Sequence, residues 1–80
     1  MTVTVLLFAS YADALGAPSV QLDLPTGATV KDVVKHLRQL RGAERLPPAP
    51  LVAVNQRFAQ GSCTLHPGDE VAVIPPVAGG

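Results

Sequence analysis

Cysteine and charged residues are scarce in this 80-residue sequence, and tryptophan is absent. The single cysteine, Cys63, excludes a disulfide within the chain and a cluster of thiolate metal ligands, and a reducing cytoplasm fits this usage best. Six basic residues balance six acidic ones without forming a dense basic run, so the sequence lacks the charge signature of nucleic-acid or anionic-membrane binding. We therefore expect a cytoplasmic domain whose partners are neither nucleic acid nor membrane.

Long apolar runs are missing as well, because eight prolines and seven glycines interrupt a chain that is 48% hydrophobic. This composition argues against a membrane span and against a disordered segment, and it indicates one small, soluble globular domain. The first residues alternate threonine with apolar residues, as a strand does, and lack the basic start of a signal peptide. No targeting segment is expected.

Motifs for catalysis and metal binding are also absent. The sequence contains no phosphate-binding GxxxxGK[ST] loop, no HExxH or paired CxxC metal motif, and no GxSxG nucleophile turn. We expect His36 and His66 to be solvated surface residues, and Cys63 to be a small apolar residue, buried or half-buried, rather than a nucleophile. A chain without catalytic residues, a metal site or a stably bound cofactor is better suited to being acted upon by other proteins.

Hydrophobic periodicity predicts strands and helices in a defined order. Alternating residues predict strands over 2–9, 19–24 and 70–74, and a strand from residue 51 that turns at Asn55 and Gln56 into a short return strand. A short helix is predicted at 10–15, capped by Ser10. A longer helix is predicted at 29–41 with Thr29 as its N-cap, and its apolar side consists of Val30, Val33, Val34, Leu37 and Leu40.

This order of elements predicts an α+β fold in which one main amphipathic helix covers one face of a small mixed sheet. When the first and last strands of such a sheet are neighbours, the arrangement is the β-grasp, or ubiquitin-like, architecture. We assign residues 1–74 to this domain and residues 75–80 to an extended, flexible C-terminal tail.

The tail residues cannot continue the last strand, because proline has no N–H group and a fixed φ. At about 3.1 to 3.3 Å per residue the tail reaches on the order of 20 Å, far enough to enter the active site of another protein. Glycine has no Cβ and can thread a narrow channel, which leaves the α-carboxylate of Gly80 as the reactive group at the tip. That carboxylate is a poor electrophile until it is adenylated with ATP by a separate enzyme. The tail consists of Pro75, Pro76, Val77, Ala78, Gly79 and Gly80.

Apolar residues are also predicted on the outer face of the sheet. Leu6 and Phe8 continue the parity of Thr4 in the first strand, and Ile74 lies opposite the core-facing set of the last strand. Apolar side chains on an outer face are typical of a binding surface. We predict that Leu6, Phe8, Phe58 and Ile74 form a partner-binding patch beside the root of the tail.

Three stretches of the sequence resemble one known family: VLLFASYADALG at 5–16, LVAVNQRF at 51–58 and GDEVAVIPPVAGG at 68–80. In this order they are similar to the small subunit of molybdopterin synthase, and the PPVAGG ending is the most specific part. The sequence departs from the family pattern at Val73 and Ile74, where many relatives have aromatic residues.

The resemblance implies a ubiquitin-like sulfur carrier. Its Gly80 would be adenylated by an enzyme similar to the ubiquitin-activating adenylyltransferases and converted to a thiocarboxylate with sulfur from a donor enzyme. The tail would then enter the large subunit of molybdopterin synthase and give its sulfur to cyclic pyranopterin monophosphate in molybdenum cofactor biosynthesis. The catalytic lysines and arginines would belong to that subunit, in a two-plus-two heterotetramer, so this chain would be the non-catalytic, sulfur-donating subunit.

Other functions fit parts of the same pattern. A sulfur carrier of this fold could serve thiamin or cysteine synthesis, although thiamin carriers usually lack the double proline. A ubiquitin-like modifier would instead join Gly80 to a lysine of a target protein. A small binding module with an incidental terminus would use no carboxylate chemistry.

Overall fold

The computed structural model of the chain describes residues 1–47 and 49–75. In chain order the elements are β1 (Thr2–Leu7), α1 (Ala9–Leu15), β2 (Ser19–Asp23), α2 (Val30–Leu37), the 3-10 helix η1 (Ala43–Arg45), β3 (Leu51–Val54), β4 (Arg57–Phe58) and β5 (Glu70–Ile74). The predicted order of strands and helices is confirmed, and η1 is an addition within the predicted loop. None of the helices in the described residues has the length and apolar character that crossing a bilayer requires.

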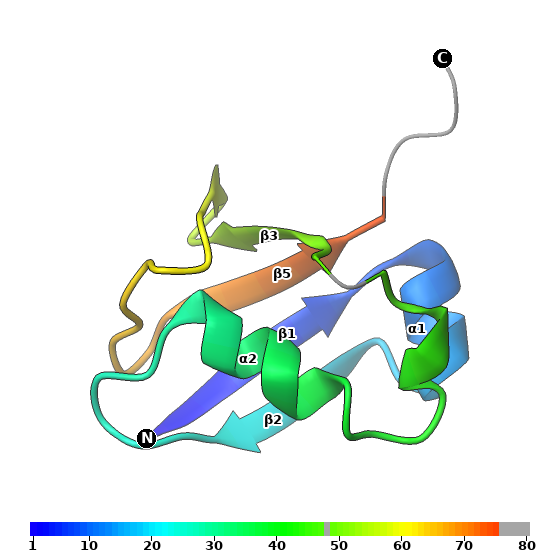
Figure 1. Cartoon of the computed structure of the whole chain (residues 1–80), viewed down its shortest axis with the longest axis horizontal. Coiled ribbons are helices and arrows are strands. Elements are labelled where there is room, and N and C mark those ends of the chain that lie inside the picture. The colour runs from blue at the N-terminus through cyan, green and yellow to red at the C-terminus, as the bar shows by residue number, and fades with distance from the viewer. Residues whose placement is uncertain (48, 76–80) are drawn as a thin grey trace.

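The strands form one mixed sheet in the order β2-β1-β5-β3-β4. β1 and β5 pair in parallel in the middle of the sheet, whereas β1 with β2, β3 with β5 and β3 with β4 are antiparallel. Figure 1 shows α2 lying across one face of this sheet, with α1 beside the end of β1. The first and last strands are therefore neighbours, which confirms the predicted α+β, β-grasp architecture.

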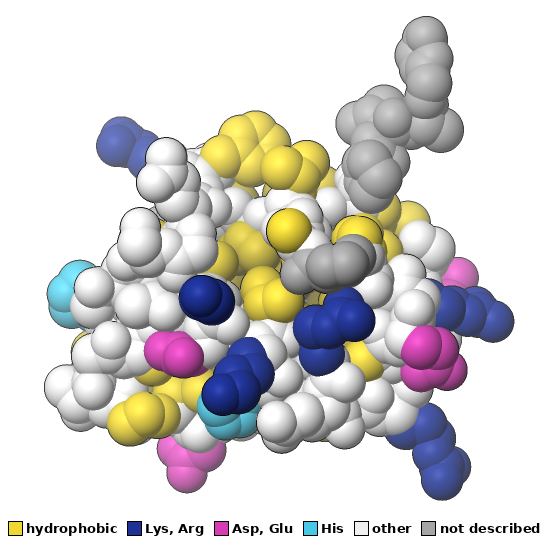
Figure 2. Space-filling view, in the orientation of Figure 1, with side chains coloured by type: hydrophobic (Ala, Val, Ile, Leu, Met, Phe, Trp, Pro, Cys, Tyr) yellow, Lys and Arg dark blue, Asp and Glu magenta, His cyan; other side chains and the backbone are white. Residues whose placement is uncertain are grey.

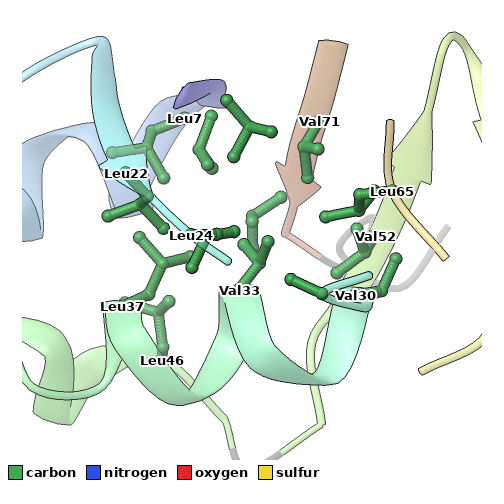
Figure 3. Close-up of a cluster of buried hydrophobic side chains, with 14 of the residues drawn as sticks. Leu7, Leu22, Leu24, Val30, Val33, Leu37, Leu46, Val52, Leu65 and Val71 are labelled. Carbon is green, nitrogen blue, oxygen red and sulfur yellow. The ribbon is translucent and has the colours of Figure 1, made fainter. Parts of the chain in front are cut away.

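The hydrophobic core fills the space between α2 and the inner face of the sheet. Alternate residues of β1 and β5 point into it, and Val5, Val71 and Val73 are completely buried. Figure 3 shows Val33 and Leu37 of α2 reaching toward these strands. No polar or charged residue is buried within residues 1–47 and 49–75, so α2 is held by apolar burial, at about 1.5–3 kcal/mol for each large side chain.

The start of α1 differs from the prediction. β1 ends two residues earlier than expected, Ala9 is already helical, and the N-cap is Phe8 rather than Ser10. No side chain caps the helix; instead the carbonyl of Phe8 accepts hydrogen bonds from the N–H groups of residues 11 and 12, at 3.0 and 3.4 Å. Ala9 adopts a left-handed φ of 48°, so the chain reverses sharply between the strand and the helix. This reversal places Phe8 at the edge of the sheet.

The predicted N-cap of α2 is confirmed. Thr29 and Asp32 form a capping box in which each side chain accepts a hydrogen bond from the other residue's backbone. The Asp32 carboxylate accepts from the Thr29 N–H at 2.9 Å and from the Thr29 hydroxyl at 3.2 Å. These bonds, the backbone one above all, hold the pKa of Asp32 below its ordinary value.

The predicted C-terminus of α2 is wrong, because the helix ends at Leu37 rather than at residue 41. The N–H groups of residues 39 and 40 bond three residues back, to the carbonyls of His36 and Leu37, which tightens the chain into a turn. Leu40 is therefore turned outward and is 37% exposed, although its spacing placed it on the apolar side. Leu46, which follows η1, is buried beside Leu37 instead (Figure 3).

Gly42 lies where the chain passes close to α1. Its φ is 90°, in the left-handed region, and a Cβ at this position would overlap the carbonyl oxygen of Ala14 in α1. The chain thus passes directly against the backbone of α1 before it enters η1, and only glycine fits at this point.

The capping box predicts an acid-dependent loss of stability. Because the pKa of Asp32 is lowered in the folded chain, its carboxylate stabilises the fold above its ordinary pKa of about 3.9, and this contribution disappears as the pH falls through the lowered value. Asp32→Asn should lower the midpoint of thermal unfolding at pH 7, and its effect should shrink as the pH falls through the lowered pKa of Asp32 and the wild-type side chain also becomes neutral.

Circular dichroism melts between pH 2 and pH 7 measure this difference. Asp13→Asn, which removes an exposed carboxylate from α1, is the matched control and should change the midpoint less at pH 7. An Asp32→Asn effect of equal size at every pH would contradict the capping-box explanation.

Candidate functional site

A row of apolar residues crosses the outer face of the sheet, on the side away from α2. Strand register aligns Leu6 of β1 with Ala72 of β5, Ala72 with Ala53 of β3, and Ala53 with Phe58 of β4. Paired residues on neighbouring strands share a face, so these four side chains form a continuous line across four strands. Ala72 and Ala53 lie between the larger Leu6 and Phe58, so the protein surface is recessed in the middle of this row.

A second row lies closer to the end of the domain. Leu51 of β3 pairs with Ile74 of β5, and Phe8 follows the last residue of β1 at the same edge. Leu51 is 51% exposed and was not predicted as a site residue. The signal was present in the sequence, since Leu51 shares the parity of Ala53 and not that of the core residue Val52. Leu6, Phe8, Leu51, Phe58 and Ile74 are called the outer-face patch below.

The structure brings the four predicted patch residues together around one shallow hollow of about 310 Å³. Phe58 is 74% exposed and Phe8 is 46% exposed, whereas Leu6 and Ile74 are half-buried at the sides of the hollow. Their role in binding stays a prediction. The hollow is lined by Leu6, Phe8, Ala53, Gln56, Phe58, Glu70, Ala72 and Ile74.

The outer face becomes polar toward its other end. There Gln21 of β2 pairs with Thr4 of β1, and Thr4 pairs with Glu70 of β5. Because β1 and β5 are parallel, their C-terminal ends meet at the same edge of the sheet, and this is the apolar edge. The outer-face patch therefore lies where the chain leaves the sheet after Ile74.

Pro75 is the last described residue of the predicted tail and is half-buried next to Ile74. Its missing N–H ends the ladder of β5, as expected for proline after a strand. The remaining tail residues, Pro76, Val77, Ala78, Gly79 and Gly80, lie outside the described part of the chain.

The opposite side of the molecule is much more strongly charged. Five of the six Lys and Arg residues belong to α2 or to the segment that follows it, up to the end of η1. Figure 2 faces α2 and shows several of these dark-blue side chains over the helix. The two faces of the domain thus differ in chemistry: α2 presents cations to solvent, and the sheet presents apolar groups.

The hairpin between β3 and β4 holds Phe58 at the border of the hollow. Asn55 and Gln56 form its two-residue turn with φ values of 51° and 71°, the pattern of a type I′ turn, which matches the twist of a hairpin. Polar bonds tie this turn to the start of β5, because the Asn55 side chain contacts both Asp69 and Glu70.

Histidine and cysteine form no reactive cluster in the described residues. His36 is half-buried, and its Nδ1 lies 2.9 Å from the carbonyl oxygen of Asp32 one turn earlier in α2. His66 is exposed on the turn before β5, and Cys63 is a free thiol that packs partly against the core, as predicted. Within residues 1–47 and 49–75 no three His, Cys, Asp or Glu side chains are grouped closely enough to hold a metal ion.

Comparison with known proteins gives matches along nearly the whole chain. The ThiS family matches residues 5–80. A molybdopterin synthase sulfur carrier subunit from Arabidopsis thaliana is 30% identical over 79 residues, covering 98% of this chain and 82% of the relative. The subunit of the same name from Chlamydomonas reinhardtii is 31% identical over 83 residues and is covered completely, as is this chain.

A solved structure shares the fold. The crystal structure of small archaeal modifier protein 1 from H. volcanii superposes with a TM-score of 0.83 at 28% identity, and the match covers 95% of this chain and 98% of that one. The β-grasp architecture that was derived from strand order is thus also found in a relative of similar length.

Proposed function

The chain belongs to the ThiS family, among the molybdopterin synthase sulfur carrier subunits, and we propose that Gly80 carries the sulfur as a C-terminal thiocarboxylate. The acceptor is cyclic pyranopterin monophosphate, and the product is the dithiolene of molybdopterin. The observation that carries this proposal is the outer-face patch, which gives a partner a binding surface at the edge where the chain leads into its Gly-Gly end.

Two steps load the carrier. The Gly80 carboxylate attacks the α-phosphorus of ATP, pyrophosphate leaves, and an acyl-adenylate is formed. Sulfur at the oxidation level of sulfide, supplied by a donor enzyme, then attacks the acyl carbon and displaces AMP, which leaves the thiocarboxylate. Donation of that sulfur to the pterin returns the carboxylate with oxygen from water. Because a dithiolene holds two sulfur atoms, each product molecule requires two donations.

The residues of this chain bind the partner proteins and present the Gly79–Gly80 end to them, and the partners carry out the catalysis. The outer-face patch binds the large subunit of molybdopterin synthase and the adenylating enzyme, while the slender Gly79–Gly80 end enters their active sites. ATP is consumed on the adenylating enzyme, so this chain needs no stably bound cofactor of its own. The large subunit supplies the cationic side chains that the reaction of a phosphorylated pterin requires.

Charge placed in the outer-face patch should prevent binding of the large subunit. Phe8→Asp and Ile74→Asp each put a carboxylate into the apolar surface, and we expect the dissociation constant to rise at least about 30-fold, as for a binding hot spot. Phe8 is the N-cap of α1, where aspartate is favourable, so Phe8→Asp should stay folded.

Isothermal titration calorimetry with the purified large subunit measures the change, and circular dichroism checks the fold. Gln21→Asp is the matched control, since Gln21 lies at the polar end of the same face and should bind as the wild type does. An unchanged dissociation constant for Phe8→Asp and Ile74→Asp would remove the outer-face patch from the proposal.

The terminal chemistry predicts a defined change in mass. After incubation with the adenylating enzyme, ATP and a sulfur source, the intact chain should gain the mass difference between one sulfur and one oxygen. A chain with one alanine added after Gly80 is the control. It should gain no sulfur, because its terminal carboxylate belongs to alanine and no longer to Gly80. Persistent failure of the wild-type chain to gain sulfur with a competent enzyme argues against the carrier function.

A second candidate function is protein modification, which the likeness to small archaeal modifier protein 1 favours. The same acyl-adenylate would then be attacked by a lysine amine, and Gly80 would end in a stable amide. Denaturing gels of cell extract distinguish the two functions: a carrier is found mainly as the free chain, whereas a modifier gives heavier adducts that are lost when Gly80 is deleted.

A further inference from the structure

Phe58, the most exposed large apolar residue described, stands on a very short strand. In the described residues β4 contains two residues and pairs with β3, through Ala53 with Phe58 and Val54 with Arg57, and the Ala59 N–H adds a bond to the Val52 carbonyl at 2.9 Å. So short a pairing at the edge of a sheet holds a side chain weakly by itself. The position of Phe58 therefore depends also on how the turn that precedes it is anchored.

Asn55 anchors that turn through three hydrogen bonds, two to Glu70 at the start of β5 and one to Asp69 just before it. Its backbone N–H donates to the Glu70 carbonyl at 2.8 Å, its side-chain Oδ1 accepts from the Glu70 N–H at 3.0 Å, and its Nδ2 donates to Asp69 Oδ1 at 2.9 Å. The orientation of the amide is fixed by its partners, because a backbone N–H can only donate and a carboxylate can only accept. Both ends of the amide are thus used.

Asp69 connects the same turn to the segment before β5. Its second oxygen, Oδ2, accepts from the backbone N–H of His66 at 2.7 Å, while Oδ1 accepts from Asn55. The bond from the Asn55 amide, followed by the one from His66, lowers the pKa of the Asp69 carboxyl, as expected when a carboxylate accepts donated hydrogens. One carboxylate therefore joins the hairpin to the turn that leads into β5.

We infer that Asn55 and Asp69 are positioning residues for docking: they hold the β3–β4 hairpin so that Phe58 stands at the border of the outer-face hollow before a partner arrives. This inference rests on the proposed function, in which the outer-face patch binds the large subunit of molybdopterin synthase. An anchor that is already in place loses less conformational entropy on binding, and so it binds more tightly.

Single substitutions should loosen the hairpin. Asn55→Asp keeps a residue that tolerates positive φ but sets two carboxylates at hydrogen-bonding distance from each other. Asp69→Asn offers one acceptor oxygen where two N–H donors, from Asn55 and His66, both need one. Each change should weaken binding of the purified large subunit roughly three- to tenfold.

The paired exchange of the two side chains restores every bond. With Asn55→Asp and Asp69→Asn together, the introduced carboxylate accepts from the Glu70 N–H and from the introduced amide, whose oxygen accepts from the His66 N–H. We expect the dissociation constant, measured by calorimetry, to return to within about twofold of the wild type. An exchanged chain that binds as weakly as the single variants overturns the inference.

A second measurement separates positioning from general stability. In a Phe58→Ala background, Asn55→Asp should no longer weaken binding, because the side chain that it positions is gone. If Asn55→Asp weakens binding equally in both backgrounds, it acts elsewhere and the inference fails.

A third measurement needs no partner. NMR order parameters of the Arg57 and Phe58 amides should fall in the single variants and recover in the exchanged chain. If the wild-type chain does not bind the large subunit, the proposed function fails, and these order parameters still decide whether Asn55 and Asp69 hold the hairpin. Order parameters that stay unchanged in both single variants overturn the inference.

Discussion

The parallel pairing of β1 with β5 is the contact on which the rest of the structure depends. It joins the first strand of the chain to the last one, with Val5 opposite Val71 and Leu6 opposite Ala72. Alternation along these two strands sends one set of residues into the core under α2 and the other set to the outer face. Because the strands are parallel, their C-terminal ends share an edge, and the chain leaves the sheet beside Phe8. The pairing of β1 with β5 thus determines which residues form the core, which form the outer-face patch, and where the chain leaves the sheet.

The two faces of the sheet differ because one amphipathic helix, α2, covers the inner face, and the described residues contain no second helix that covers the outer face. α2 supplies the apolar stripe that covers the inner face, and its solvent side carries cations such as Lys31 and Lys35. Within residues 1–47 and 49–75 no element covers the outer face, and so Phe58 and Leu51 keep more than half of their surface exposed. A fold optimised only for stability would place polar residues there, as it does at Thr4 and Gln21. The apolar end of this face is the basis for the proposed partner-binding surface.

Agreement between sequence and structure is closest where side chains decide the conformation locally. Period-two alternation identified the core-facing residues of β1 and β5, and the Thr29–Asp32 spacing identified the capping box of α2. The predictions fail where the conformation is determined by contacts between residues that are distant in the sequence. Leu40 has helical spacing, yet α2 stops before it, the chain tightens into a turn, and Leu46 from beyond η1 is buried beside Leu37. Serine is a favourable N-cap residue, yet the chain reverses at Ala9, so α1 begins there and Phe8, not Ser10, is its N-cap.

The sequence alone determined the kind of fold, because periodicity and capping residues act through neighbouring residues, and its Pro-Pro-Val-Ala-Gly-Gly stretch is the basis of the proposed carboxylate chemistry. Parity along a strand, which is a local property, also marked Leu6, Phe8 and Ile74 as outward-facing, and Phe58 was predicted to join them. Only the tertiary structure decided that these residues line one hollow, that Leu51 lies beside them, and that Asn55 reaches Asp69 across 14 positions of sequence. Strand register sets these contacts, and register is settled when the whole sheet pairs, not by any one strand.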